Sequence, residues 1–194
     1  DQKKVEKIVL NSASSFYWGM NLLKKDQRRA MFSIYSFCRI VDDIADSEGL
    51  KSKKINSLND WKKKVDDIYI KKTDGYITRE LKIAIEKYGL IKTDFIAIIN
   101  GMKMDIGKKI VYPSQNELDL YCDRVAGAVG CLSMKVFGIN HKNSRKYAKS
   151  LGRAFQYTNI LRDIKEDCSM GRCYIPIDII EKSGLNKKKP ELLV

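Results

Sequence analysis

Apolar residues recur every three or four positions along most of this chain, whereas strict alternation of polar and apolar residues is scarce. This period is that of an α-helix with one buried face, and it disfavours a β-sheet as the main architecture. In segment 57–70, for example, Leu58, Trp61, Val65 and Ile68 follow one another at helical spacing. We therefore predict an all-α fold whose functional site lies between helices.

Start and stop signals divide the chain into successive helices. Ser114 and Glu117 have the spacing of a capping box, and Gly89 is suited to end a helix. Residues 171–176 are expected to form a loop. The predicted helices cover 26–46, 57–70, 78–88, 93–106, 114–138 and 143–167.

Length and composition fit one domain. With 194 residues, of which 44% are hydrophobic, the chain can bury one sizeable core. We expect residues 1–194 to form a single helical domain and a monomer. No apolar run approaches the about 18 residues that span a membrane, and the first residues lack the apolar core of a signal peptide.

The net charge of +13 has three interpretations. The lysines are scattered and are not interleaved with aromatic residues, so a solvated basic surface is favoured. Attraction to anionic lipid headgroups ranks second, because each basic residue near such a surface adds about 1 kcal/mol. Nucleic-acid binding ranks last, and no nucleic-acid partner is expected.

Cysteine and histidine usage restricts the compartment and the chemistry. The five cysteines contain no CxxC pair, and an odd number of thiols without an export signal is typical of a reduced, cytoplasmic protein. We interpret them as small buried apolar residues. His141 is the only histidine, which disfavours zinc hydrolysis and Ser-His-Asp catalysis.

One predicted helix carries aligned polar residues near its C-terminal end. Tyr35, Arg39, Asp42 and Asp46 are spaced four, three and four residues apart, which places them within roughly 60° of arc on one face. Two aspartates one turn apart repel each other. Their spacing becomes favourable when a divalent cation lies between them.

A second predicted helix repeats this arrangement. Gln156, Asn159, Asp163 and Asp167 are spaced three, four and four residues apart and share one face within roughly 80°. Amide and carboxylate oxygens are the ligands that Mg²⁺ prefers, and phosphate oxygens commonly complete its coordination. Either aspartate pair alone is more simply a solvated helix end, but two such faces far apart in the chain favour a shared magnesium site.

Two arginines lie beside these acidic faces. Arg39 and Arg162 could bind phosphate directly, because a guanidinium group matches phosphate oxygens in a bidentate manner. The alternative is local pairing with Asp43 and Glu166. The sequence leaves both interpretations open.

Five segments follow one another in the chain: SSFYWGMNLL, DQRRAMFSIYSFCRIVDDIAD, DLYCDRVAGAVG, LGRAFQYTNILRDIKED and GRCYIP. In these segments, and over about residues 12–176, the chain resembles the squalene/phytoene synthase family. The third segment is most similar to the presqualene diphosphate synthases of the bacterial hopanoid pathway, with phytoene synthases close behind. The resemblance implies an isoprenoid-synthase-type helical bundle with a central apolar cavity.

The resemblance also implies roles for particular residues. Mg²⁺ is the implied cofactor, and its ligands correspond to Asp42, Asp46, Asn159, Asp163 and Asp167. Catalytic positions correspond to Tyr35, Arg39, Gln156 and Arg162. The substrate-binding positions are Ser12, Ser14, Ser15, Tyr35, Arg39, Tyr121, Gln156 and Arg162.

The implied reaction joins two prenyl diphosphates head to head, with farnesyl diphosphate as the expected substrate. One allylic diphosphate ionises, the second double bond attacks, and loss of a proton closes a cyclopropane, giving presqualene diphosphate. No protein base is evident, so the released diphosphate or Tyr35 is a hypothesis for the proton acceptor. Such lipid substrates suit a cytoplasmic protein in peripheral contact with the inner face of a membrane.

Several alternatives stay open. A phytoene synthase would use geranylgeranyl diphosphate, and a non-catalytic relative would only bind lipid or act as a scaffold. Head-to-tail chain elongation fits the DDxxD pattern at 42–46 but not the second segment, which lacks an adjacent aspartate doublet. No glycine-rich dinucleotide motif supports a reductive step to squalene. Because members of this family continue for several helices beyond GRxYxP, we expect this domain to be truncated at its C-terminal end.

Overall fold

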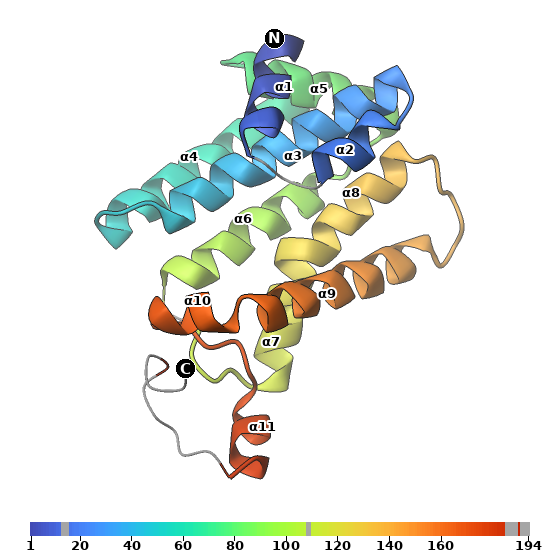
Figure 1. Cartoon of the computed structure of the whole chain (residues 1–194). Coiled ribbons are helices and arrows are strands. Elements are labelled where there is room, and N and C mark those ends of the chain that lie inside the picture. Colours follow the sequence, from blue (N-terminus) through green and yellow to red (C-terminus); the bar gives the residue numbers. More distant parts are fainter. Residues whose placement is uncertain (13–15, 108–109, 185–189, 191–194) are drawn as a thin grey trace.

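The computed structural model describes residues 1–12, 16–107, 110–184 and 190, and within these ranges it is built from helices joined by short turns (Figure 1). Among the described residues, the extended pairing found is one isolated parallel bridge between Val111 and Cys173. The predicted all-α class is therefore confirmed. No described helix is both long and apolar enough to cross a membrane.

The helices are, in chain order, α1 (Gln2–Asn11), α2 (Phe16–Asn21), α3 (Lys25–Asp46), α4 (Lys51–Tyr69), α5 (Tyr76–Tyr88), α6 (Lys92–Ile106), α7 (Gln115–Cys122), the π-helix η1 (Asp123–Gly127), α8 (Ala128–Val136), α9 (Ser144–Arg162), α10 (Ile164–Ser169) and α11 (Ile177–Lys182).

Most predicted boundaries agree with these elements to within two residues. Gly89 ends α5 in the left-handed conformation, with φ of 60°, as a C-terminal glycine does. Ser114 and Glu117 form the predicted capping box at the start of α7. Two predictions differ from the structure in the N-terminal half. Helix α4 begins six residues before the predicted start at 57, and helices α1 and α2 were not predicted.

The predicted helix over 114–138 contains an interruption. Residues Asp123–Gly127 form a π-helix between α7 and α8. Such turns are rare and concentrate at functional positions. They insert an extra residue into the helical path and so change which side chains share a face, which apolar periodicity does not reveal.

The prediction of one unbroken helix over 143–167 is wrong at a single residue. Asp163 has φ of −101° and ψ of 11°, which lies outside the helical range and separates α9 from α10. The hydrogen bond from Asp167 N to Asp163 O, at 2.8 Å, restores the helical pattern directly afterwards. Asp163 and Asp167 therefore follow a break rather than a straight continuation of the face that carries Gln156 and Asn159.

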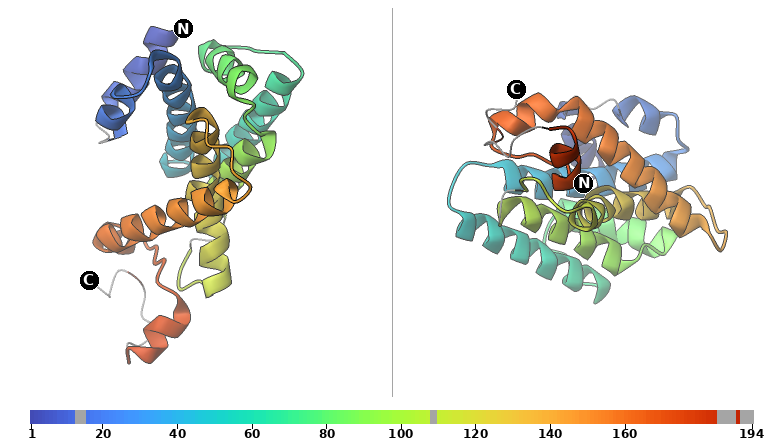
Figure 2. Two further views of the ribbon diagram at one scale, coloured as in Figure 1. Left: turned by 90° about the vertical axis from the view of Figure 1, so that its right-hand side faces the viewer. Right: turned by 90° about the horizontal axis from the view of Figure 1, so that it is seen from below.

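The main core lies between α3 and α6 and the helices packed against them, which include α8 from the second half of the chain. Figure 2 shows the same bundle from two further sides. Phe37 of α3 meets Phe95 of α6 and Trp61 of α4 edge to face, with ring centroids 5.3 Å and 5.8 Å apart. The fully buried rings of Phe37 and Phe95 each contribute about 1.5–3 kcal/mol to stability. This core holds the helix that carries the first acidic face rigidly in place.

Close backbone approach positions α9. A Cβ atom added at Gly152 would lie only 2.6 Å from the carbonyl oxygen of Ala126 in η1, and one at Gly130 would lie 2.5 Å from the carbonyl oxygen of Ala148. Glycine is required at both contacts because any side chain would push the two backbones apart. The helix before the second acidic face thus packs directly on the π-helix.

Candidate functional site

The first acidic face lies at the C-terminal end of α3. The preceding turns of this helix bury Phe37 and Val41, so the opposite side carries Arg39, Asp42 and Asp46 at the surface. In Figure 1 this end of α3 lies on the same side of the molecule as the C-terminal end of α6 and helix α10. Segments distant in the sequence therefore converge there.

Tyr35, the first residue of this aligned set, is half-buried. Its hydroxyl donates a hydrogen bond to Ser12 Oγ at 3.0 Å, and Ser12 in turn donates to the carbonyl oxygen of Val9 at 2.6 Å. Two predicted substrate-binding residues are thereby brought together. Ser14 and Ser15, predicted for the same role, lie outside the described residues.

Arg39 makes the local pairs that the sequence left open. Its guanidinium group is 2.8 Å from Asp43 Oδ1 and 3.4 Å from Asp42 Oδ2. Asp42 is incompletely neutralised by this pairing. Partial burial and the neighbouring charge of Asp46 together raise the pKa of Asp42 to about 6, while Arg39 acts in the opposite direction.

The second acidic face follows α9. Arg162 donates two hydrogen bonds of 2.7 Å to the carboxylate of its neighbour Asp163, and this bonding holds the pKa of Asp163 below its ordinary value. Arg162 therefore pairs with Asp163 rather than, as considered above, with Glu166. Burial raises the pKa of Asp167 to about 6, and the charge of Asp46 on α3 contributes to that increase.

Arg172 joins the two acidic faces. It lies in the loop after α10, its side chain is 17% exposed, and its Nη2 donates to Asp46 Oδ1 at 3.1 Å. Its positive charge also lowers the pKa of Asp42 and of Asp167. Arg172 thus stands between aspartates that are separated by more than 100 residues in the chain.

A buried cluster of two tyrosines and an aspartate adjoins Arg172. Tyr121 and Tyr174 are stacked, with ring centroids 5.1 Å apart, and both donate hydrogen bonds to Asp105 of α6. Burial raises the pKa of Asp105 to about 6, although both tyrosines and Arg172 act to lower it. Tyr121 was a predicted substrate-binding residue, and the structure places it in this cluster.

Sequence reasoning assigned no role to Arg172, Tyr174 or Asp105. The first two lie in the segment GRCYIP, which follows the second acidic face closely and was part of the family resemblance. That proximity was a usable signal. Asp105 had no comparable signal, because a single acid near the end of an apolar helix is most simply a solvated residue.

The predicted metal ligands are only partly assembled. Gln156 and Asn159 are half-buried on α9. Across residues 1–12, 16–107, 110–184 and 190, no three His, Cys, Asp or Glu side chains are grouped closely enough to hold a metal ion. The roles of Asp42, Asp46, Asn159, Asp163 and Asp167 as ligands stay predictions.

The predicted central apolar cavity also stays a prediction. An open groove of about 490 Å³ runs along α4, where Trp61 and Ile44 are accompanied by Lys63, Lys64 and Asp74. Its lining is largely charged, and it includes neither Asp42, Asp46 nor any residue of α9. It is therefore unsuited to be the apolar tunnel that the family resemblance implies.

Residues 9–192 match the sequence model of a family described as squalene/phytoene synthase. The presqualene diphosphate synthase of Zymomonas mobilis is 47% identical over 174 residues, which are 89% of this chain and 60% of that protein. Phytoene synthase 3 of Zea mays is 35% identical over 90% of this chain and 42% of its own length. A crystal structure of a dehydrosqualene synthase superimposes on 95% of this chain and 64% of its own, with a TM-score of 0.83 and 27% identity.

The chain spans 60–64% of the length of the bacterial presqualene diphosphate synthases that it matches. The matched part includes both acidic faces and the loop that carries Arg172.

Proposed function

The chain belongs to the squalene/phytoene synthase family, and from this premise we propose that the protein is a prenyltransferase that joins two prenyl diphosphates head to head. The proposed substrate is farnesyl diphosphate, and the proposed products are presqualene diphosphate and free diphosphate. The greater identity to presqualene diphosphate synthases than to phytoene synthases supports this choice.

The observation that carries the proposal is the meeting of the two acidic faces at Arg172. Asp46 of the first face accepts a hydrogen bond from Arg172 at 3.1 Å, and its charge raises the pKa of Asp167 in the second face. A folded protein gains no stability from crowding like charges. Their convergence is therefore better explained by bound metal cations that bridge to an anionic diphosphate than by structural need.

The donor chemistry of this region fits Mg²⁺. We assign Asp42, Asp46, Asn159, Asp163 and Asp167 as its ligands; all five carry oxygen donors, and none is a thiolate or an imidazole. The incomplete neutralisation of Asp42 and Asp167 is consistent with a site for added positive charge. When bound, Mg²⁺ would neutralise diphosphate oxygens and so assist departure of the leaving group.

The arginines and hydroxyl groups around these acids are proposed to hold the diphosphate. Arg39 and Arg162 are 46% and 67% exposed in their side chains, so each can exchange its local carboxylate for phosphate oxygens. Ser12, Ser14 and Ser15 add hydroxyl donors, and Gln156 and Tyr121 are proposed to face the reacting carbons.

Tyr35 is the proposed protein group nearest the transferred proton. Because its hydroxyl donates to Ser12, a lone pair of its oxygen remains available to take up the proton lost from carbon as the cyclopropane closes. The released diphosphate is the alternative acceptor. Substitution of Tyr35 by Phe distinguishes them, since diphosphate would still serve in that variant.

The partners follow from the substrates. Prenyl diphosphates partition into membranes, so we include a peripheral contact between the basic surface of the protein and the inner face of a membrane. A cytoplasmic monomer and the absence of a nucleic-acid partner complete the proposal.

Product analysis tests the proposed function. The protein in its full natural length is supplied with Mg²⁺ and with farnesyl or geranylgeranyl diphosphate separately, and lipid products are identified by mass spectrometry. We expect presqualene diphosphate from the C15 substrate. A C40 product from geranylgeranyl diphosphate alone would make the protein a phytoene synthase, a chain-lengthened product with isopentenyl diphosphate would make it an elongating enzyme, and metal-independent binding without turnover would make it a scaffold.

A further inference from the structure

Asp105 occupies a position that the proposed reaction does not itself require. It lies one residue before the end of α6, and the side chains of three other segments surround it. Tyr121 comes from α7, Tyr174 from the loop after α10, and Asp46, whose charge raises the pKa of Asp105, from α3. The carboxylate of Asp105 thus lies between the two buried tyrosines, close enough to Asp46 of the first acidic face and to Arg172 for their charges to act on it.

Both oxygens of this carboxylate have a fixed partner. Tyr174 Oη donates to Oδ1 at 2.8 Å, and Tyr121 Oη donates to Oδ2 at 3.1 Å. The two hydroxyl oxygens are 3.5 Å from each other, and both rings are about 5% exposed. A neutral side chain of the same shape could accept only one of these two hydrogen bonds, since an amide has one oxygen.

Tyr174 connects this clamp to Arg172, two residues earlier in the same short loop. The backbone between them is held on both sides: Cys173 N donates to Ile110 O, and Tyr112 N donates to Cys173 O, both at 2.9 Å. Arg172 N donates to Asp167 O at 2.8 Å. With Tyr174 anchored on Asp105, the direction in which Arg172 leaves the backbone is set.

The charge of Asp105 acts on Arg172 as well. Burial alone would lower the pKa of the Arg172 guanidinium group, but the neighbouring Tyr174, Asp105 and Asp46 raise it above its ordinary value. The guanidinium group donates a hydrogen bond to Asp46 of α3, and it is stabilised at longer range by the charge of Asp105 on α6. Without the Asp105 carboxylate, the Arg172 side chain would no longer be fixed in its present position and could pair more closely with the aspartates of the acidic faces.

We propose that Asp105 is a positioning residue that acts through Tyr174 to hold Arg172 between the two acidic faces. The inference rests on the proposed function, because Arg172 so placed can meet a diphosphate that arrives with its metal ions. Asp105 need not touch substrate. Its removal is expected to alter diphosphate binding only through Arg172.

A double-mutant cycle tests this dependence. Asp105→Ala, Arg172→Ala and the double variant are prepared in the protein of full natural length, and binding of inorganic diphosphate with Mg²⁺ is measured by titration calorimetry. We expect Asp105→Ala to weaken binding about 10- to 100-fold, as loss of an outer-shell partner does. The double variant should bind no more weakly than Arg172→Ala alone. Multiplied effects in the double variant would overturn the proposal.

Conservative variants guard against a merely structural effect. Tyr174→Phe removes one hydroxyl from Asp105, whereas Tyr157→Phe removes a hydroxyl from a different carboxylate, Asp119, that does not face Arg172. We expect weaker diphosphate binding in the first and parental binding in the second, at equal melting temperature. If Asp105→Ala does not fold, Asp105→Asn takes its place in the cycle, with the same criterion of non-additivity.

The outcomes separate this inference from the proposed function. A parent protein that binds diphosphate and shows the coupling, but transfers no prenyl group, would refute the proposed function and uphold the role of Asp105. Full prenyl transfer, with additive effects of Asp105→Ala and Arg172→Ala on diphosphate binding, would uphold the proposed function and refute the role of Asp105. A parent that does not bind diphosphate with Mg²⁺ would refute both.

Discussion

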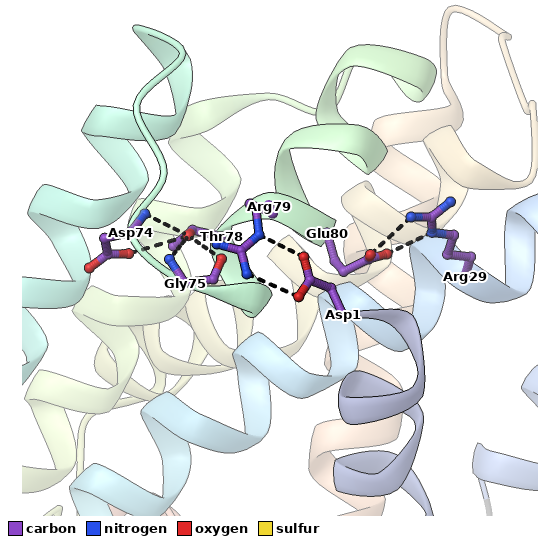
Figure 3. Close-up of polar contacts among 7 residues, drawn as sticks. All are labelled: Asp1, Arg29, Asp74, Gly75, Thr78, Arg79 and Glu80. Carbon is purple, nitrogen blue, oxygen red and sulfur yellow. Dashed lines mark hydrogen bonds and ion pairs between the residues drawn. The ribbon is translucent and has the colours of Figure 1, made fainter.

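The charged side chains at the two ends of the α3 helix are paired in different ways. Near its N-terminal end, Arg29 donates two hydrogen bonds, of 2.6 Å and 2.9 Å, to Glu80 of α5, and Arg79 pairs likewise with Asp1 (Figure 3). Near its C-terminal end, Asp42 and Asp46 repel each other; Asp46 pairs with the half-buried Arg172, and Asp42 Oδ2 lies 3.4 Å from Arg39 Nη1. The first arrangement is neutralised pair by pair, and the second keeps an excess of negative charge.

This contrast separates a structural from a functional use of charged residues. A buried carboxylate such as Glu80, whose side chain is 3% exposed, is tolerated because a bidentate partner satisfies it. Asp163 has a bidentate partner in Arg162, but that arginine is 67% exposed, and Asp42 and Asp167 have no bidentate partner, so a ligand can still supply positive charge there. Perturbed carboxylates of this kind concentrate at functional sites.

The largest effect is expected from the acidic end. Asp42→Asn and Asp163→Asn should each reduce diphosphate release from farnesyl diphosphate by about 100- to 1,000-fold, the size of effect seen when one electrostatic contact to a reacting group is removed. Asp42→Asn should not lower the melting temperature, because it relieves repulsion by Asp46. Release is measured by a coupled diphosphate assay.

Asp66→Asn is the matched control, since Asp66 is a surface carboxylate paired with Lys92 on the outside of the bundle. It should retain parental activity. Full activity of both Asp42→Asn and Asp163→Asn would show that the metal-ligand assignment is wrong.

Substitutions at the N-terminal end of α3, where the charges are paired, should change the stability of the protein and leave its activity unchanged. Arg29→Ala leaves Glu80 buried without its partner and should lower the free energy of unfolding by about 3 kcal/mol, measured by urea denaturation. Activity per folded molecule should not change. Lys92→Ala, which breaks the exposed pair with Asp66, should cost less than about 1 kcal/mol. Equal losses in the two variants would remove the distinction drawn between buried and exposed pairs.

A smaller effect should follow from moving α9 without touching any charge. Gly152→Ala places a methyl group 2.6 Å from the carbonyl oxygen of Ala126, which is fixed backbone, and should cost about 1–3 kcal/mol in stability. Gly19→Ala in α2 is the control, because no atom lies within 4 Å of its added Cβ, and it should be neutral or stabilising. Thermal unfolding compares them, and similar melting temperatures would mean that η1 and α9 can separate freely.

Local pattern was sufficient for much of the fold. The apolar spacing in α3 to α6, the αL glycine at Gly89 and the capping box at Ser114 all depend on residues within a few positions of each other, and all were confirmed. The π-helix and the break at Asp163 were not predictable in this way. The π-helix packs against α9 at Gly152, a contact between residues far apart in the chain, and no proline or glycine stands at Asp163 to mark the break.

The candidate site divides in the same manner. Membership in the squalene/phytoene synthase family and the helical class were predictable from residue spacing and ordered motifs. The first acidic face lies on the unbroken helix α3, where helical geometry converts spacing into a shared face, but the second is interrupted at Asp163. The sequence did not predict that the guanidinium group of Arg172 lies beside Asp46. Arg172 and Asp105 acquire their positions from contacts among α3, α6 and the loop after α10, and such contacts exist only once the chain has packed, since no local rule relates residues so distant in sequence.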